Sequence, residues 1–490
     1  MVLGVRCSVL GNPSTRRPTL SAYGDAQMTK PGIGLLGLYL ELYDGAMPEV
    51  RPRIDAFYAR IADEFGKRGL DVVTAPVCRV RDEFMKAVKA FEDAKVDCIV
   101  TLHLAYSPSL ESAEALSRTK LPVIILDTTP TYGYGPQQDS AELMFNHGIH
   151  GVQDLCNLLI RSGKPFEIEA GHWDKSDVLD RVAAWARAAV VAGRMRTARV
   201  GVIGRPFPGM GDFAVPEDVL RATIGVEAVP CDFAMLRSLL PAEHDAEVES
   251  EMAADRARFA VEGLDESAHR TTTRTCLAVR RWVEKEKLTA FTMNFEDIKR
   301  STGLPTVPFL EASKAMARGQ GYAGEGDVLT AALVGALAST YPDTTFAEMF
   351  CPDWENDSIY ISHMGEMNVN LVDGQAVLVA KEMPWVDADA PVLAVGRFRG
   401  GNAVLVNVAP GPQDTFTLIV APVTMLDVEG EDRMADSIRG WFRPRMAVPD
   451  FLEEYSRLGG THHSALVYGE LTADLVRFGE IMGWDVAVLG

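Results

Sequence analysis

Long hydrophobic runs are absent from this chain of 490 residues. No apolar stretch approaches the ~20 residues that a helix needs to cross a bilayer. Near the start, Arg16-Arg17 is followed by Pro18 and polar residues, and a continuous apolar signal-peptide core is missing. We therefore expect residues 1–30 to form a flexible tail, with Met28 as an alternative start, and the protein to be cytoplasmic without a membrane partner.

Closely spaced cysteines and excess positive charge are also missing. The seven cysteines are scattered and form no CxxC motif, a pattern that disfavours a zinc cluster and fits unpaired thiols in a reducing compartment. Lys and Arg total 48 against 68 Asp and Glu, for a formal net charge of −20 at pH 7. This charge disfavours nonspecific binding to nucleic acid or anionic membranes, and it fits an enzyme that handles neutral or cationic ligands.

Two common catalytic signatures are absent: a Walker A string and a GxSxG nucleophile elbow. Two GxGxxG strings do occur, at Gly32–Gly37 and Gly319–Gly324. A dinucleotide fingerprint needs a strand before the glycines and a helix that begins among them. The first string lies inside an expected strand, and the second follows an expected helix. An NAD-linked oxidoreductase remains an alternative, but we assign no cofactor-binding residue to it.

What the chain does contain is a regular alternation of strands and helices. From residue 32, apolar strands such as GIGLLGLYL and LPVIILDT alternate with amphipathic helices, and a second such set opens with RVGVIG at Arg199. After residue 338, short strands are separated by Gly, Pro and Asp turns. The pattern predicts two doubly wound parallel-sheet α/β domains followed by a β-rich, antiparallel or barrel-like domain. The predicted boundaries are a tail at 1–30 and domains at 31–197, 198–325 and 326–490.

Two carboxylates stand out because each follows a strand beside residues that favour a turn. Glu296 ends the strand-like run FTMNF, and Glu325 lies between two glycines in GEGD, just before an apolar helix. Carboxylates at the ends of strands and helices suit a hard divalent cation or a proton-transfer step. A surface Glu beside a helix-capping Asp is an equally good interpretation of these residues alone.

The histidines are few, and several also lie at element ends. His103 ends the strand VDCIVTLH, where open α/β sheets bind ligands, so it is a substrate-binding candidate. His147 and His150 are three residues apart in FNHGIHG, so on a helix they would share one face. His363 ends SIYISH, and His462-His463 precede another strand, on which neighbouring side chains point to opposite faces. Singly, each histidine is better explained by a structural role. Taken with the two carboxylates they form a credible mixed nitrogen–oxygen metal site, a ligand set that suits Mn²⁺.

At these residues the chain resembles the L-arabinose isomerase family and, more distantly, the L-fucose isomerases. The matching strings are FNHGIHG with a downstream GHW, FTMNFEDI, GYAGEGDVLTAAL, NDSIYISHMGE and GGTHHSALVYG, in the family's order over roughly residues 32–475. The resemblance implies a flavodoxin-like N-terminal domain, a related central domain and a β-rich C-terminal domain. It also implies a homo-oligomer, a trimer or hexamer, with active sites between subunits.

The resemblance further implies a set of site residues. A catalytic Mn²⁺, or another divalent cation, would be bound by Glu296, Glu325, His363 and His463. Glu296 and Glu325 would also be the catalytic carboxylates, without an indication of which is the base. His150 matches a family histidine that reaches the sugar, in a neighbouring subunit's site.

One segment departs from the family. Where its members carry a polar SQHLYG-type segment that contacts the sugar, this chain reads LYLELYDG, so that Leu40 replaces a glutamine and Glu41 a histidine. Glu41 is therefore a candidate residue of an altered substrate-binding surface. We expect a metal-dependent aldose–ketose isomerase that works through an enediolate on a small sugar of unassigned identity. The alternative is a sugar-binding or regulatory protein, or a metal-dependent enzyme of modified sugars, on the same scaffold.

Overall fold

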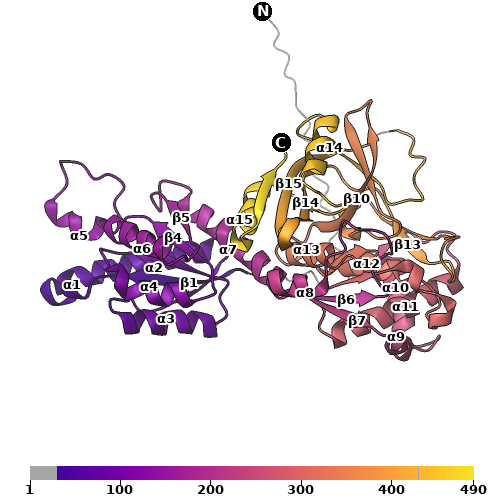
Figure 1. The fold of residues 1–490 in the computed structure, drawn as a ribbon, viewed down its shortest axis with the longest axis horizontal. Coiled ribbons are helices and arrows are strands. Elements are labelled where there is room, and N and C mark those ends of the chain that lie inside the picture. The colour runs from indigo at the N-terminus through magenta and orange to yellow at the C-terminus, as the bar shows by residue number, and fades with distance from the viewer. Residues whose placement is uncertain (1–29, 429) are drawn as a thin grey trace, which may run out of the picture.

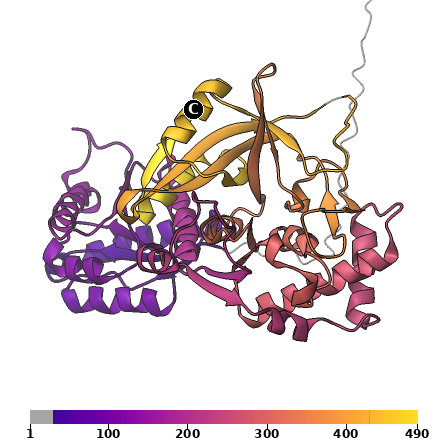
Figure 2. The ribbon, with the colours of Figure 1, turned by 45° about the vertical axis from the view of Figure 1, so that its right-hand side comes forward.

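The computed structural model describes residues 30–428 and 430–490, which form an N-terminal α/β unit, a central α/β unit and a C-terminal barrel (Figure 1). The predicted tail and Met28 lie outside the described residues. Figure 2 shows the barrel standing over the central unit, with the N-terminal unit beside them. The predicted fold class is confirmed. The predicted domain boundaries stay predictions.

The N-terminal unit is a five-stranded parallel sheet in the order β2-β1-β3-β4-β5. Its strands are β1 (Gly32–Leu38), β2 (Asp71–Thr74), β3 (Cys98–His103), β4 (Val123–Asp127) and β5 (Glu167–Ala170). Its helices are α1 (Glu41–Ala46), η1 (Pro48–Val50), α2 (Arg51–Lys67), α3 (Arg81–Asp93), α4 (Ser109–Arg118), η2 (Ser140–Glu142), α5 (Leu143–Asn146), α6 (Ile149–Arg161) and α7 (Val178–Arg196). Apolar side chains of α2 and α7 cover one face of the sheet, and those of α3, α4 and α6 cover the other.

Packing against this sheet explains the first glycine string. A Cβ at Gly34 in β1 would lie 2.5 Å from the ring of Phe91 in α3. The glycine therefore lets a helix approach the strand, and the helix does not begin among the glycines as a nucleotide site requires. This geometry disfavours the NAD-linked alternative.

The central unit is a four-stranded parallel sheet in the order β7-β6-β8-β9. Its strands are β6 (Arg199–Ile203), β7 (Glu227–Cys231), β8 (Ala290–Met293) and β9 (Gly321–Gly324). Its helices are α8 (Glu217–Val219), the π-helical turn η3 (Leu220–Ile224), α9 (Phe233–Leu239), α10 (Ala246–Arg258), α11 (Glu266–Lys285), η4 (Phe295–Asp297), η5 (Arg300–Thr302), α12 (Phe309–Ala317) and α13 (Val328–Ala338). Helix α13 is apolar on all sides because it packs against this sheet and against the barrel strands β10, β14 and β17.

The C-terminal unit is a closed antiparallel barrel, in which β14-β17-β10-β11-β16-β15 pair in turn and β15 returns to β14. Its strands are β10 (Thr344–Asp353), β11 (Ser358–Ser362), β14 (Gly401–Pro410), β15 (Phe416–Met425), β16 (Gly440–Pro444) and β17 (His463–Tyr468), with β18 (Asp485–Val488) added parallel to β15. The remaining elements are η6 (Val369–Leu371), η7 (Pro412–Asp414), α14 (Val448–Arg457), α15 (Thr472–Met482) and the separate pair β12 (Val377–Ala380) and β13 (Val392–Val395). Helix α15 packs on α7 and joins the barrel to the N-terminal unit (Figure 1).

Two predictions from composition concern membrane-spanning helices and cysteine pairing. Within residues 30–428 and 430–490, no helix combines the length and the apolar character that crossing a membrane would take. The six cysteines in the described residues are unpaired, and three of them are buried. Cys7 lies outside the described residues.

Candidate metal centre

Two acidic and two imidazole side chains converge where the central sheet meets the barrel. Glu325 follows β9 in the turn that leads into α13. Glu348 on β10 lies directly opposite His463 at the start of β17. His363 follows β11, the other neighbour of β10. Because paired residues on adjacent antiparallel strands project from the same face, strand pairing brings the side chains from β10 and β17 together. We call Glu325, Glu348, His363 and His463 the metal-centre group.

The distances within this group suit ligation of one ion. Nε2 of His463 lies 3.5 Å from Oε2 of Glu325, and Nε2 of His363 lies 4.0 Å from Oε2 of Glu348. The candidate ligand atoms of Glu348, His363 and His463 all lie within 4.8 Å of one another. The same holds for Glu325, His462 and His463. Since His463 belongs to both sets, one small region collects carboxylates and imidazoles together.

Buried carboxylates orient both histidines. Nδ1 of His463 lies 3.0 Å from Asp327 Oδ2, and Nδ1 of His363 lies 2.7 Å from Glu366 Oε2. Each carboxylate accepts the Nδ1 proton, which directs Nε2 away from that carboxylate and lets it bind a cation when the ring is neutral. Nε2 of His463 is buried and has no hydrogen-bond partner among the described residues. This orphaned acceptor, with the mixed nitrogen–oxygen donors around it, fits a divalent transition metal.

The electrostatics of the group also favour a cation. Burial raises the pKa of Glu325, but the nearby imidazoles of His462, His463 and His363 have the larger opposite effect and lower it to about 2. Burial lowers the pKa of His463, whereas its hydrogen bond to Asp327 and the nearby carboxylate of Glu325 raise that pKa to about 9. Burial raises the pKa of Glu348 despite the neighbouring imidazoles. The group as a whole therefore holds protons, and a divalent cation would displace these protons when it binds.

Local structure makes room for these side chains. A Cβ at Gly324 would lie 2.8 Å from Cε1 of His363, so the last glycine of the second string allows close approach of the imidazole. The next residue, Glu325, has a positive φ of 64°. A non-glycine residue in this left-handed conformation is uncommon and often marks a functional site. The rings of His363 and His463 both pack edge-on against Phe346, at centroid distances of 4.6 and 4.9 Å.

Glu296 is the predicted ligand that the structure does not bring into this group. It lies in η4 after β8, where its backbone N–H donates to the Asn294 side chain. Its own side chain is exposed and forms no hydrogen bond or ion pair within the described part of the chain. The strand ends earlier than the sequence pattern suggests, so the carboxylate turns outward. Within the described residues, the carboxylate grouped with His363 and His463 is that of Glu348.

Sequence reasoning missed Glu348 because it lies inside a strand and not at its end. The local signal is the alternation in TTFAEMF, where Phe346 and Glu348 share a face of β10. A carboxylate two residues from a buried aromatic, on the same face of an apolar strand, needs a partner. That partner comes from β11 and β17, which the sequence does not place beside β10.

A loop of the central unit covers the group from outside. Oδ2 of Asp212 lies 2.6 Å from Nδ1 of His462 and accepts the backbone N–H of the same residue at 2.9 Å. Nε2 of His462 faces Glu325 Oε2 at 3.8 Å. The ring of Phe213 stacks on His463, with centroids 5.1 Å apart and an interplanar angle of 8°. Neither Asp212 nor Phe213 carries a sequence signal for this role.

The other predicted substrate residues lie in the N-terminal unit. Glu41 on α1 and His150 on α6 are exposed. Helix α1 lies at the edge of the N-terminal unit that is remote from the barrel (Figure 1). The ring of His150 lies 6.1 Å from that of His147, whose Nε2 is 3.1 Å from the Tyr43 hydroxyl. No hydrogen bond or ring contact in the described part of the chain joins them to the metal-centre group. Within one chain, these residues and the metal-centre group belong to separate surfaces.

His103 is the predicted substrate residue that the structure buries most deeply. Its side chain is packed against Gly151, and neither ring nitrogen has a partner among the described residues. Burial lowers its pKa to about 3, so the imidazole is neutral. A buried neutral side chain at this position has no access to a sugar at the surface. The geometry favours a core histidine.

A cavity of about 170 Å³ adjoins His363. Its walls include the buried Met383 and the exposed aromatic rings of Phe350 and Trp385. Lys381 and Asp436 add opposite charges at its edge, with Nζ and Oδ2 4.0 Å apart. Apolar walls with a few polar groups are typical of sites for small ligands.

Comparison with known proteins assigns the chain to a family. Three family models match consecutive segments: the L-arabinose isomerase N-terminal domain over residues 44–197, the central domain over 231–340 and the C-terminal domain over 343–485. The chain belongs to the L-arabinose isomerase family. The predicted resemblance is confirmed, and with it the prediction of an enzyme of the aldose–ketose isomerase class.

Individual L-arabinose isomerases are distant relatives of the chain. It is 26% identical to that of Geobacillus kaustophilus over 438 residues, which covers 85% of each sequence. It is also 26% identical to that of Lactiplantibacillus plantarum, over 83% of this chain and 87% of the relative. Among solved structures, a periplasmic solute-binding protein of Actinobacillus succinogenes with bound D-allose is similar over 64% of this chain and 92% of its own. At 15% identity and a TM-score of 0.17, that similarity is too weak to support any conclusion about this chain.

Proposed function

We propose that this L-arabinose isomerase family member is a divalent-metal-dependent sugar isomerase whose ligands are Glu325, Glu348, His363 and His463. The observation that supports this most strongly is the orientation of the two histidines. Each is held at Nδ1 by a buried carboxylate and directs Nε2 toward the carboxylates of the group. Histidines with a purely structural role in a core have no need to direct two Nε2 atoms toward the same carboxylates.

The proposed chemistry moves a carbonyl between C1 and C2 of an aldose through an enediolate. A bound Mn²⁺ or similar cation supplies Lewis-acid stabilisation of the charge on the sugar oxygens. Glu325 and Glu348 are the carboxylates within reach of the same point, so one of them takes the proton from one carbon and returns it to the other. Asp327 and Glu366 keep the imidazoles fixed during this step, and the Phe213 ring restricts water on one side.

The proposed substrate is L-arabinose or a related aldose. The support is the name of the relatives, L-arabinose isomerase, together with the cavity beside His363. Leu40 and Glu41, in place of the family's glutamine and histidine, leave room for a different sugar. A sugar-binding protein, or a metal-dependent enzyme of modified sugars, remains the second candidate because of these two positions.

We also propose that the exposed edge of the N-terminal unit packs on a second copy of the chain. Leu42, Leu143 and Ile149 are 66%, 50% and 45% exposed. Leu143 and Ile149 flank His147 in the sequence, and Leu42 precedes Tyr43, whose hydroxyl lies 3.1 Å from Nε2 of His147. Apolar side chains gathered at a surface favour association, and closed symmetric oligomers such as a trimer or hexamer bury such patches. In that arrangement His150 and Glu41 of one subunit would approach the metal-centre group of another.

The test begins with metal-stripped protein. We expect isomerase activity to be absent, to return with Mn²⁺ and to be lost again with a chelator. A panel of aldopentoses and 6-deoxyhexoses, L-arabinose included, identifies the sugar by the ketose formed. Bound Mn²⁺ without conversion of any sugar would favour the binding-protein alternative. Conversion that persists in fully stripped protein would overturn the metal-dependent proposal, and the mass in solution tests the oligomer.

A further inference from the structure

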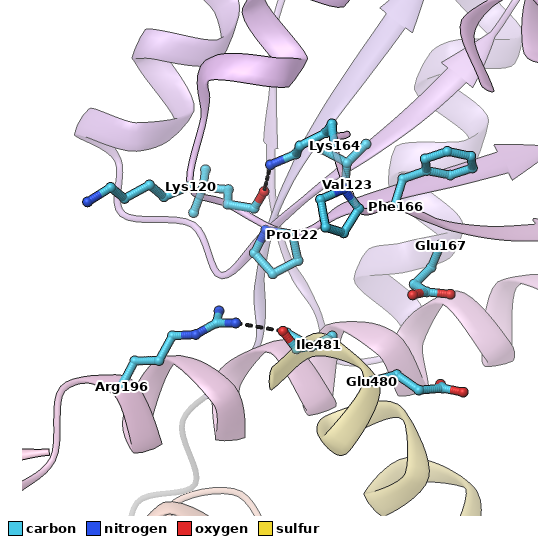
Figure 3. Close-up of a pocket in the computed structure, with 11 residues that line it drawn as sticks. Lys120, Pro122, Val123, Lys164, Phe166, Glu167, Arg196, Glu480 and Ile481 are labelled. Carbon is cyan, nitrogen blue, oxygen red and sulfur yellow. Dashed lines mark hydrogen bonds between the residues drawn. The ribbon is translucent and has the colours of Figure 1, made fainter. Parts of the chain in front are cut away.

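A second cavity, of about 240 Å³, lies at the junction of the N-terminal unit and the last helix and shares no lining residue with the metal-centre group (Figure 3). It is bounded by the loops that enter β4 and β5, by the end of α7 and by the end of α15. The catalytic proposal uses none of its residues. Because α15 follows the barrel in the chain, a ligand here would contact two units at once.

The charged groups around this cavity are separated by sign. In Figure 3, Lys120 and Arg196 stand on one side of Pro122, and Glu167 and Glu480 stand on the other. The walls between them are apolar, formed by side chains that include those of Pro122 and Phe166. A cavity with cations at one end, carboxylates at the other and apolar walls between them matches a small molecule that carries both charges.

At the carboxylate end, Glu167 has no direct ion-pair partner among the described residues. Glu167 is half-buried, and no hydrogen bond or ion pair engages its side chain within the described part of the chain. Burial and repulsion from Glu480 and Glu169 raise its pKa to about 7, against the opposing effect of Arg477. A half-buried carboxylate beside two others is costly unless a cation joins it. An ammonium group between Glu167 and Glu480 would supply that cation.

The cationic end keeps free donors. Arg196 uses one N–H on the Ile481 carbonyl, at 2.6 Å, and its remaining guanidinium protons are available. Lys120 is exposed, and its ammonium group has no partner in the described residues. Lys164 is less available, since its ammonium group donates to the carbonyls of Thr119 and Leu121. Two groups therefore remain to bind a carboxylate.

We propose that this cavity binds a small zwitterion, with its ammonium group between Glu167 and Glu480 and its carboxylate at Lys120 and Arg196. The ligand class is that of amino acids whose two charges are separated by a short apolar chain. Such a ligand would hold α15 against the N-terminal unit. The proposal is independent of the isomerase proposal, because it uses neither metal nor sugar.

The experiment is calorimetric titration of the full chain with four probes. Two are ω-amino acids, γ-aminobutyrate and ε-aminocaproate, and two are their singly charged counterparts, butylamine and butyrate. We expect saturable binding of at least one ω-amino acid at millimolar concentration, and weaker binding of both singly charged probes. Binding of butyrate alone would reassign the cavity to anions, and equal binding of butylamine would reassign it to cations. Either result, or no saturable binding at all, would overturn the proposal.

Variants separate this site from adventitious binding. Glu167→Gln should weaken binding of the ω-amino acid by about 10–100-fold, the effect of losing one charged hydrogen-bond partner. Glu49→Gln, at an exposed position elsewhere in the same unit, is the matched control and should change nothing. Binding to the wild type should also strengthen as pH rises from 6 to 8, because Glu167 loses its proton, and this dependence should vanish in Glu167→Gln. Unchanged affinity in a folded Glu167→Gln protein would contradict the proposal.

Discussion

The metal-centre group can be compared with a second buried polar group, which lies between α10, α11 and α12. There, Nζ of the fully buried Lys314 donates to Glu251 at 2.8 Å and pairs with Asp255. Arg280 binds both Glu251 and Glu311, at 2.7 and 2.8 Å. We call these residues, with His269 on Asp255 and Arg318 on Glu311, the Lys314 group.

The difference between the two groups lies in how their charges are balanced. In the Lys314 group, each carboxylate lies against a side chain that carries or can carry a positive charge, so it can hold three helices together without an ion. In the metal-centre group, carboxylates surround imidazoles, and a buried Nε2 has no partner in the described part of the chain. Burial of charge therefore does not by itself indicate function. What distinguishes the metal-centre group is an unpartnered imidazole nitrogen with carboxylates beside it.

The largest expected effect distinguishes Glu348 from the predicted ligand Glu296. Glu348→Gln keeps the shape of the side chain but removes a charged ligand. We expect Mn²⁺ affinity to fall and sugar turnover to drop by at least ~100-fold, without loss of the fold. Glu296→Gln is the matched control, and it should leave Mn²⁺ affinity unchanged. The reverse outcome would restore Glu296 to the ligand set and remove Glu348 from it.

The next effect is on stability and should spare the metal-centre group. Lys314→Met leaves Glu251 and Asp255 with less positive charge, so the free energy of unfolding should fall by ~3–5 kcal/mol. Lys89→Met, which breaks the exposed surface pair with Asp93, should leave the free energy of unfolding almost unchanged. Denaturant unfolding measures both. If Lys314→Met proves as mild as Lys89→Met, the Lys314 group is not a structural centre.

A smaller effect tests the orientation of His463. Asp327→Asn keeps the oxygen that caps α13 through the Thr330 N–H, but removes the negative charge near Nδ1 of His463. We expect Mn²⁺ affinity to fall by about 10–100-fold with little change in stability. Metal titration and thermal unfolding separate these two results. Unaltered affinity would show that the carboxylate does not orient the imidazole.

The smallest effect is a change in the pH dependence of folding. Burial raises the pKa of Glu251, but Arg280 and Lys314 lower it further, so that its pKa lies well below the usual value. A lowered pKa means that the stability from ionised Glu251 is fully present above the ordinary value and is lost as pH falls through the value in the fold. Glu251→Gln should therefore be less stable than the wild type near neutral pH and lose stability less steeply in acid. Equal slopes in acid unfolding would contradict this.

Much of the architecture could be predicted from local pattern. Apolar strands alternating with helices predict the two parallel sheets, because strands covered on both faces must be apolar throughout. The site was only partly predictable. Glu325 and His363 lie at element ends beside glycine and were found, whereas Glu348 lies within β10 and was missed. Glu296 was predicted because it ends the strand-like run FTMNF and because the string FTMNFEDI resembles the family; β8 itself ends at Met293.

The sequence by itself determined the fold class, the family and three of the four proposed ligands, since these depend on local periodicity and on short motifs. Only the tertiary structure places the carboxylate of Glu348 beside His363 and His463. Glu348 meets His463 because β10 and β17, more than a hundred residues apart in the chain, pair in one register of a closed barrel. Side-chain direction in a sheet alternates with each residue, so that register, and not the local sequence, determines which donors face one another.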